Sequence, residues 1–192
     1  MDRFLTDISD AEILLVTRRL IRSRGVDGFD LDDVAIKVRT TEAVIEAHYT
    51  EKNSLLRAVK DGVLEDLRFA LQNSVIGVEE PAQKIYLICK TYRSFANKQP
   101  ELFRLMHRPE LKTEEFAEEK EVCDPVVQII SQIAGDDHAV SASRFLASFM
   151  YGFCTMEIDG SFRLNGSVDE AFEYSLRSYM SGLEGAKNLT FL

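Results

Sequence analysis

The sequence predicts an all-α protein. Apolar side chains recur at intervals of three and four residues along most of its 192 residues, which is the period of an amphipathic helix. Capping-box pairs, Ser9 with Glu12 and Ser167 with Glu170, stand directly before two of these periodic stretches. The sequence contains neither strand-like alternation nor an internal repeat. We therefore expect about nine helices.

Three short helices are expected first, and the last two are predicted to form a helix-turn-helix. Gly25 is placed to end the first of them, and Asp30 can cap the second. The expected positions are 9–25, Leu31–Val38 and Glu42–His48. Two short helices separated by a turn of about two residues are typical of DNA-binding helix-turn-helix units.

Longer helices are expected in the rest of the chain. A leucine-rich helix at 51–75 connects an N-terminal domain, residues 1–50, to a C-terminal domain, residues 51–192. Pro81 and Pro100 suit the first turns of two further helices, and Asp124 with Pro125 indicates the start of another that ends before Gly135. The last two helices are expected at about residues 138–158 and 168–183.

The charge is unevenly distributed along the chain. The net charge of −9 argues against a protein whose whole surface binds nucleic acid, since both would be negatively charged. Residues 1–60 hold 10 Lys and Arg and 11 Asp and Glu, whereas residues 61–192 hold 13 and 21. The N-terminal part is thus almost neutral. No apolar run is long enough to span a bilayer and the first ten residues lack the apolar segment of a secretory signal, so we expect a cytoplasmic protein without a membrane partner.

No enzymatic chemistry is indicated. The three histidines lie far apart, and neither a glycine-rich phosphate loop nor a nucleophile elbow is present. The spacing of the three cysteines, Cys89, Cys123 and Cys154, fits neither a disulfide framework nor a zinc site. We expect buried, reduced thiols, with redox sensing by one of them as the alternative. The chain is therefore expected to be no enzyme and to carry no metal or cofactor.

Residues 13–59 resemble the DNA-binding domain of the TetR family of regulators. The resemblance rests on an apolar stripe that ends in Arg-Gly at residues 20–25 and an acidic pair leading into a small apolar helix at 31–35. It rests also on an aromatic residue followed by Lys and Leu at fixed distances in 48–56. Residues 92–106 and 149–162 are similar, more loosely, to one branch of TetR-type effector domains.

The resemblance implies a DNA-binding surface on the second helix of the helix-turn-helix. Thr41 matches a residue that caps this helix and can donate to a phosphate, and Lys52 matches a basic residue that pairs with a phosphate. Arg39 stands in place of the usual turn glycine, at a cost of about 1 kcal/mol if its φ is positive. The expected DNA-binding residues are Arg39, Thr40, Thr41, Glu42, Glu46, His48, Tyr49 and Lys52.

Two acidic side chains depart from the family pattern. Glu42 stands where a basic residue is common, and Glu46 stands where a phosphate-binding Tyr is typical. Either carboxylate could accept from the amine of cytosine, whereas Glu42 also suits a helix N-terminus without any role in binding. Two functions follow. One is a regulator that binds double-stranded DNA at a palindromic operator, and the other is a degenerate regulator that acts through a protein partner.

The resemblance also implies an effector pocket and a homodimer. The expected ligand-binding residues are Tyr86, Tyr92, Phe95, Phe103, Met106, His107, Phe149 and Tyr151. The alternative is that these side chains only fill a core. The last two helices are expected to pair with those of a second copy. Proteins of this type are commonly repressors that a small molecule releases from DNA, so we expect a small apolar or amphipathic effector.

Overall fold

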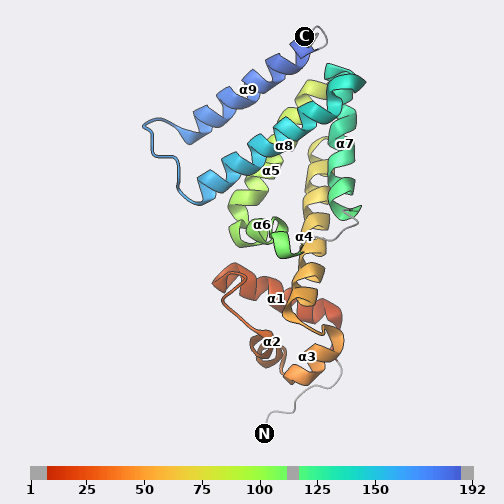
Figure 1. Ribbon diagram of the computed structural model, residues 1–192, viewed down its shortest axis with the longest axis vertical. Coiled ribbons are helices and arrows are strands. Elements are labelled where there is room, and N and C mark those ends of the chain that lie inside the picture. Colours follow the sequence, from red (N-terminus) through yellow and green to blue (C-terminus); the bar gives the residue numbers. More distant parts are fainter. Residues whose placement is uncertain (1–7, 112–116, 187–192) are drawn as a thin grey trace. The chain divides into compact units, whose positions relative to one another are not determined.

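The computed structural model describes residues 8–111 and 117–186 (Figure 1). Within these ranges the chain forms nine α-helices, one short 3-10 turn at Pro109–Leu111 and no strand, which confirms the all-α prediction. The helices are α1 (Asp10–Arg24), α2 (Leu31–Val38), α3 (Glu42–His48), α4 (Lys52–Ser74), α5 (Pro81–Lys98), α6 (Pro100–Met106), α7 (Ala117–Ala134), α8 (Asp136–Ile158) and α9 (Val168–Ala186).

Local signals define the first two helices as the sequence predicts. The Ser9 hydroxyl accepts from the backbone N–H of Glu12 at 3.3 Å, and the Glu12 carboxylate reaches back to the Ser9 backbone, so the capping box is complete. Asp30 and Asp33 form an equivalent pair at the start of α2, with the Asp30 carboxylate accepting from the Asp33 N–H at 2.9 Å. These bonds satisfy amide groups that a helix cannot satisfy itself.

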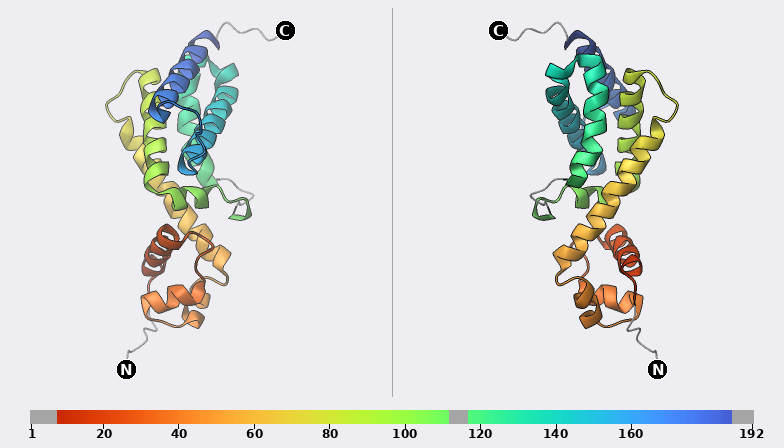
Figure 2. Two further views of the ribbon diagram at one scale, coloured as in Figure 1. Left: turned by 90° about the vertical axis from the view of Figure 1, so that its left-hand side faces the viewer. Right: turned by 90° about the vertical axis from the view of Figure 1, so that its right-hand side faces the viewer.

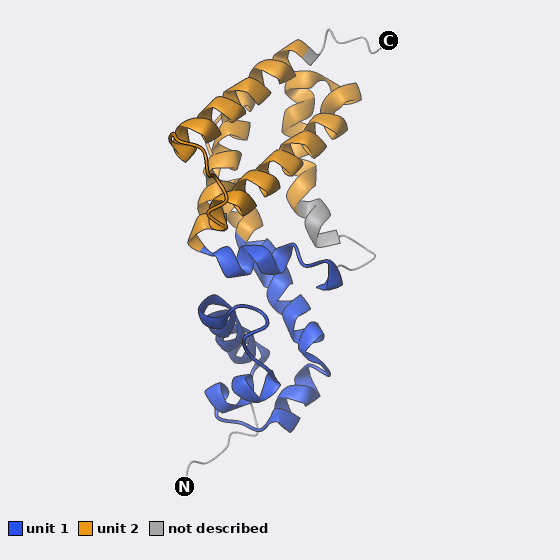
Figure 3. Cartoon of the chain, turned by 60° about the vertical axis from the view of Figure 1, so that its left-hand side comes forward, with its two compact units in different colours: residues 1–66, 99–116 blue, residues 67–98, 117–192 orange. Residues whose placement is uncertain are grey.

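The chain divides into two compact units, coloured separately in Figure 3. The first contains residues 1–66 and 99–116, and the second contains residues 67–98 and 117–192. In the first unit, Ile13, Ile21, Val34, Ile45 and Leu55 bring four helices, α1 to α4, to one fully buried core. The functional boundary predicted after residue 50 stays a prediction, since a compact unit is defined by its packing alone.

The second unit is a helical bundle. The helix α8 packs against α5, α7 and α9, and α8 and α9 run beside each other in both views of Figure 2. Its core includes Ile85, Ile130, Met150, Phe172 and Leu176, one or more from each of these four helices. Among the described residues no helix is long and apolar enough to cross a membrane.

The predicted start of α7 is wrong. The sequence suggests that a helix begins at Asp124 and Pro125, but α7 begins at Ala117 and carries Pro125 in its interior. An interior proline removes one backbone hydrogen bond and costs about 3 kcal/mol. Packing of α7 against α5, α8 and α9 offsets this cost, and Pro125 is exposed, so that its ring displaces no core side chain.

Candidate functional site

The helix-turn-helix of the first unit is built on a strained turn. Arg39, which stands in place of the family's usual turn glycine, has a φ of +60° and a ψ of 42°, the left-handed conformation that glycine adopts most easily. Its backbone N–H and that of Thr40 return to carbonyl groups of α2, with 2.9 Å between Thr40 N and Ala35 O. The turn is therefore short and fixed, and α3 begins at Glu42 with Thr41 as its capping residue.

The outward face of α3 is small and acidic. Ile45 is fully buried and Val44 is half-buried, which anchors one side of the helix. The opposite side exposes four side chains at helical spacing, Glu42, Ala43, Glu46 and Ala47. The sequence predicts that both glutamates face outward, and both are exposed.

The two threonines before α3 differ in exposure. Thr41 is exposed, and its hydroxyl makes no capping hydrogen bond to the helix, so the capping bond that the sequence suggests is not formed. Its hydroxyl is thereby left for another acceptor. Thr40 is only 2% exposed. Its side chain belongs to the core of the unit rather than to the outer surface.

The far end of α3 is tied to α1. His48 Nδ1 lies 2.7 Å from Asp10 Oδ1, within hydrogen-bonding distance. Tyr49 is half-buried, and this burial, together with the Asp10 carboxylate, raises the pKa of its hydroxyl. Both predicted aromatic residues thus hold the end of α3 against α1. Such contacts keep α3 in one orientation.

Lys52 is engaged inside the unit. Its ammonium donates to the backbone carbonyl of Phe29 and lies 4.4 Å from the centre of the Phe29 ring. The start of α4 is therefore fastened to the segment before α2. Two other cations, Lys37 and Arg39 at the end of α2, are exposed. They are the positive charges nearest in sequence to α3 that are open to solvent.

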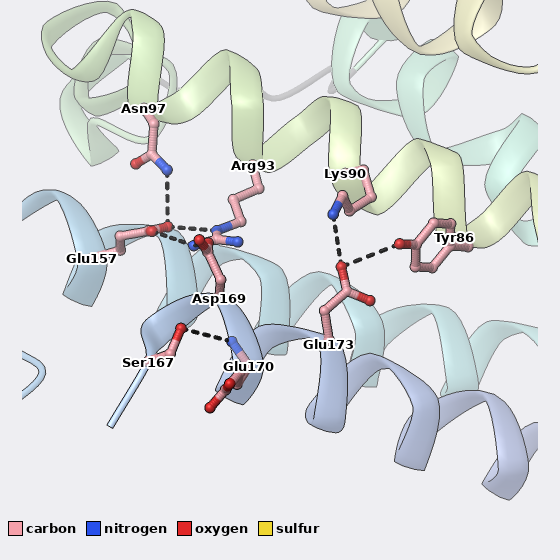
Figure 4. Close-up of polar contacts among 9 residues, drawn as sticks. All are labelled: Tyr86, Lys90, Arg93, Asn97, Glu157, Ser167, Asp169, Glu170 and Glu173. Carbon is pink, nitrogen blue, oxygen red and sulfur yellow. Dashed lines mark hydrogen bonds and ion pairs between the residues drawn. The ribbon is translucent and has the colours of Figure 1, made fainter. Parts of the chain in front are cut away.

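In the second unit a buried arginine joins three helices (Figure 4). Arg93 of α5 donates through Nε to Glu157 Oε2 at 2.8 Å, and its terminal nitrogen contacts both Glu157 and Asp169. The guanidinium carbon lies 4.7 Å from the Phe172 ring centre and 5.6 Å from that of Phe153. Hydrogen bonding to Arg93 lowers the pKa of Glu157.

The Glu157 carboxylate is fully used by contacts within this cluster. Glu157 is 19% exposed, and its carboxylate is neutralised by Arg93 and accepts also from Asn97 at 2.9 Å. It is therefore committed to the fold. The sequence gives no local signal for this pair, because Arg93 and Glu157 lie 64 positions apart and each helix also carries other charged residues. Only the three-dimensional structure pairs them.

A second polar contact lies one turn away on α5. Lys90 Nζ lies 2.7 Å from Glu173 Oε1, and the Tyr86 hydroxyl donates to the same oxygen at 3.1 Å. The Lys90 hydrogen bond lowers the pKa of Glu173. Figure 4 shows both clusters connecting α5 to α9. Tyr86, predicted to line a ligand pocket, is thus bonded to a neighbouring helix.

The eight predicted effector residues are distributed over both units. Tyr86, Tyr92, Phe95, Phe149 and Tyr151 belong to the second unit, where Phe95 is buried and Tyr151 is 44% exposed. Burial raises the pKa of the Tyr92 hydroxyl.

The other three, Phe103, Met106 and His107, lie in or directly after α6 in the first unit. Phe103 and Met106 are buried, and the His107 ring packs edge-on against Phe103 at 4.8 Å. Within the first unit Phe103 and Met106 fill core space, and the half-buried His107 lies at the edge of this core.

An apolar pocket is present elsewhere in the second unit. It lies between α4, α5 and α7, has a volume of about 50 Å³, and is lined by Arg68, Leu71, Gln72, Val75, Ile88, Val122, Pro125, Val126 and Ile129. None of the eight predicted residues lines it. Ligand pockets usually measure about 300–1,000 Å³, so an effector of ordinary size would have to widen it.

The exposed surface of α8 and α9 combines large apolar side chains with small residues. Phe145 and Tyr151 on α8 are 62% and 44% exposed, and Tyr174 on α9 is 75% exposed. Between them lie small exposed residues, which are Ala147 and Ser148 on α8 and Ala171, Ser178, Ser181, Gly182 and Gly185 on α9. Small side chains permit close approach of another helix, and exposed aromatic side chains offer apolar area to it.

No group of three His, Cys, Asp or Glu residues in the described ranges is placed to hold a metal ion. Two of the three cysteines, Cys89 and Cys154, are buried and therefore shielded from solvent. Cys123 is exposed.

The comparisons with known proteins agree with this architecture. Residues 85–179 match the family model described as the tetracyclin repressor-like C-terminal domain. Among curated protein sequences none matches the chain.

Solved structures match over almost the full length. A protein of unknown function from Rhodococcus sp. RHA1 shares 22% identity at a TM-score of 0.80, covering 93% of this chain and 97% of that one. A TetR variant from Acinetobacter baumannii AYE in complex with minocycline shares 16% identity at a TM-score of 0.72, covering 94% and 99%. A TetR transcriptional regulator from Streptomyces coelicolor shares 15% identity at a TM-score of 0.76, covering 94% and 100%. Residues 85–179 therefore belong to the TetR-type C-terminal domain family, and the chain as a whole has the fold of the solved TetR structures.

Proposed function

We propose that this chain is a cytoplasmic repressor that binds a palindromic operator as a homodimer and is released by a small apolar or amphipathic effector. The observation that carries the proposal is the exposed face of α3, which projects from a helix-turn-helix whose turn and both helix ends are fixed. A helix presented in this way can enter the major groove while its neighbours contact phosphates.

Phosphate contacts are assigned to the exposed groups beside α3. Lys37 and Arg39 supply positive charge, and the Thr41 hydroxyl, which makes no capping bond, can donate to a phosphate oxygen. Lys52 acts first by orienting α4 through the Phe29 carbonyl. We expect Lys52→Ala to weaken binding to all DNA sequences alike, because both a phosphate contact and an orienting contact are independent of base sequence.

Homodimerisation is assigned to the exposed face of α8 and α9. Two recognition helices must lie about 34–36 Å apart to occupy successive major grooves, which requires two copies held in a fixed geometry. The small residues of α9 and the exposed aromatic rings of Phe145 and Tyr174 support a close helical contact there. We expect Tyr174→Arg to shift the protein to monomer in sedimentation velocity, whereas Glu79→Arg, an exposed change outside both helices, leaves the dimer intact.

Effector release is assigned to the second unit. The apolar pocket between α4, α5 and α7 supports an apolar ligand, and α4 continues from this unit into the first one. A ligand that widens the pocket shifts α4. It weakens DNA binding only as far as it binds one state more tightly than the other, typically by 1–3 kcal/mol.

A second candidate is a regulator that acts through a protein partner. The acidic outward face of α3 favours this candidate, because carboxylates are repelled by phosphates. The hydrogen bond of Lys52 to the Phe29 carbonyl favours it too, because this ammonium is already used inside the unit. DNA binding separates the two candidates.

The experiment is selection of bound sequences from a random duplex pool by the purified, effector-free protein at low and physiological salt. Enrichment of an inverted repeat is the expected result. A folded dimer that enriches no sequence at either salt concentration would exclude the operator-binding function and leave the partner-binding one.

A further inference from the structure

We infer that Glu42 and Glu46 select cytosine in the operator half-site, with the methyl groups of Ala43 and Ala47 placed against thymine. This inference rests on the proposed DNA-binding function and specifies what that same face of α3 recognises. All four side chains are exposed and occupy the face of α3 opposite the buried Ile45. They present only hydrogen-bond acceptors and methyl groups.

Both carboxylates are open to a ligand. Nearby acids are used inside the unit, since Asp10 contacts His48 and Asp33 contacts Arg24 at 2.8 Å. In the described part of the chain, neither Glu42 nor Glu46 forms a hydrogen bond or an ion pair with another side chain. The fold therefore gives neither of them an internal structural partner.

Base-edge chemistry then favours cytosine. An ionised carboxylate only accepts hydrogen bonds, and cytosine presents an N4 amine donor in the major groove without an acceptor of its own beside it. Guanine presents two acceptors there, and thymine presents one acceptor and a methyl group. Adenine places its N7 acceptor next to its amine, which repels the second carboxylate oxygen. The cytosine amine has one neighbouring acceptor, the O6 of the paired guanine, whereas the adenine amine lies between its own N7 and the O4 of the paired thymine, so cytosine offers Glu42 or Glu46 the less repelled donor.

The spacing of the two glutamates sets the spacing of the bases. Four residues along an α-helix advance about 6 Å, and successive base pairs rise about 3.4 Å. Glu42 and Glu46 therefore reach bases one or two pairs apart in the same half-site. Ala43 and Ala47 flank them on the same face, and an alanine methyl group can pack on the thymine C5-methyl.

The same charges lower non-specific affinity. Each carboxylate is repelled by the phosphates of any duplex, but only at a site with correctly placed cytosines does it also accept a hydrogen bond from a base. We therefore expect weak binding to random DNA and a large ratio of specific to non-specific affinity.

The test uses a base that lacks the donor while keeping its pairing. The selected half-site is synthesised with N4-methylcytosine at the cytosine facing Glu46, so that the methyl group replaces the amine hydrogen in the major groove. Wild-type protein is expected to lose affinity about 5- to 150-fold in fluorescence anisotropy, the range for one specific base contact. Glu46→Ala is expected to bind both duplexes within about twofold of each other, because the interaction is already gone.

A matched variant controls for charge. Glu79→Ala removes one exposed acid outside the first unit, so it changes the net charge equally but is expected to keep the full methylation effect. If the selected site has no cytosine pair at this spacing, or if Glu46→Ala and wild type respond equally to N4-methylcytosine, cytosine recognition is wrong while DNA binding stands. If no sequence is selected at all, the proposed function fails and this inference fails with it.

Discussion

Replacement of Arg93 tests whether the polar cluster between α5, α8 and α9 is a structural junction. The Arg93 side chain is 11% exposed and that of Glu157 is 19% exposed, so Arg93→Met leaves a largely buried carboxylate without its cation. Breaking a buried pair in this way costs about 3–5 kcal/mol. Asn97 still donates to Glu157, and a methionine retains apolar contact with the phenylalanine rings, which places the expected loss near the lower end, about 3 kcal/mol.

The assay is urea unfolding at a fixed protein concentration, followed by circular dichroism. Lys90→Met is the matched control, since it removes a cation of the same helix from a 44% exposed position beside Glu173 and is expected to cost less than about 1 kcal/mol. The double change Arg93→Met with Glu157→Met is expected to recover most of the loss, because no buried charge remains. Equal costs for Arg93→Met and Lys90→Met would refute the assignment of a buried ionic junction.

Three further predictions concern the turn, the acid response and the thiols. Arg39→Gly is expected to raise the free energy of unfolding by up to about 1 kcal/mol, because its φ of +60° strains any residue with a Cβ, and thermal unfolding checks this. The Arg93 bond lowers the pKa of Glu157, so the pair stabilises the fold above the unfolded-state pKa of about 4.3 and is lost as the pH falls through the lower folded value. Glu157→Gln should therefore flatten the acid side of the stability profile, and an unchanged profile would contradict this. In a thiol titration at pH 8, the exposed Cys123 is expected to react at once, whereas Cys89 and Cys154, whose pKa burial raises to about 12, react only after unfolding.

Local chemistry is what the sequence predicted well. The capping box of Ser9 with Glu12 and the cap at Asp30 are contacts between neighbours in the chain, so local sequence is enough to specify these helix starts. The left-handed turn at Arg39 was suggested only by the family's glycine at this position, because an arginine by itself gives no signal for a positive φ. The all-α class followed from helical periodicity.

Contacts between distant segments were not predictable from the sequence. Arg93 finds Glu157 and Asp169 only after α5, α8 and α9 have packed together. Pro125 likewise looks like a helix start in the sequence, because a proline inside a helix costs folding free energy. The packing of α7 that offsets this cost cannot be deduced from the sequence. The same limit applies to the expected effector residues, because large apolar and aromatic side chains are typical both of a ligand pocket and of a packed core.

The most direct test of operator binding by a homodimer is the effect of half-site spacing on binding. Duplexes carry the selected half-site as an inverted repeat whose centre-to-centre distance is changed one base pair at a time, and affinity and stoichiometry are measured together by fluorescence anisotropy and sedimentation. The account predicts an affinity maximum at about 10–10.5 base pairs or a multiple of that distance, with two chains bound per duplex. Binding of single chains that is indifferent to spacing would contradict it.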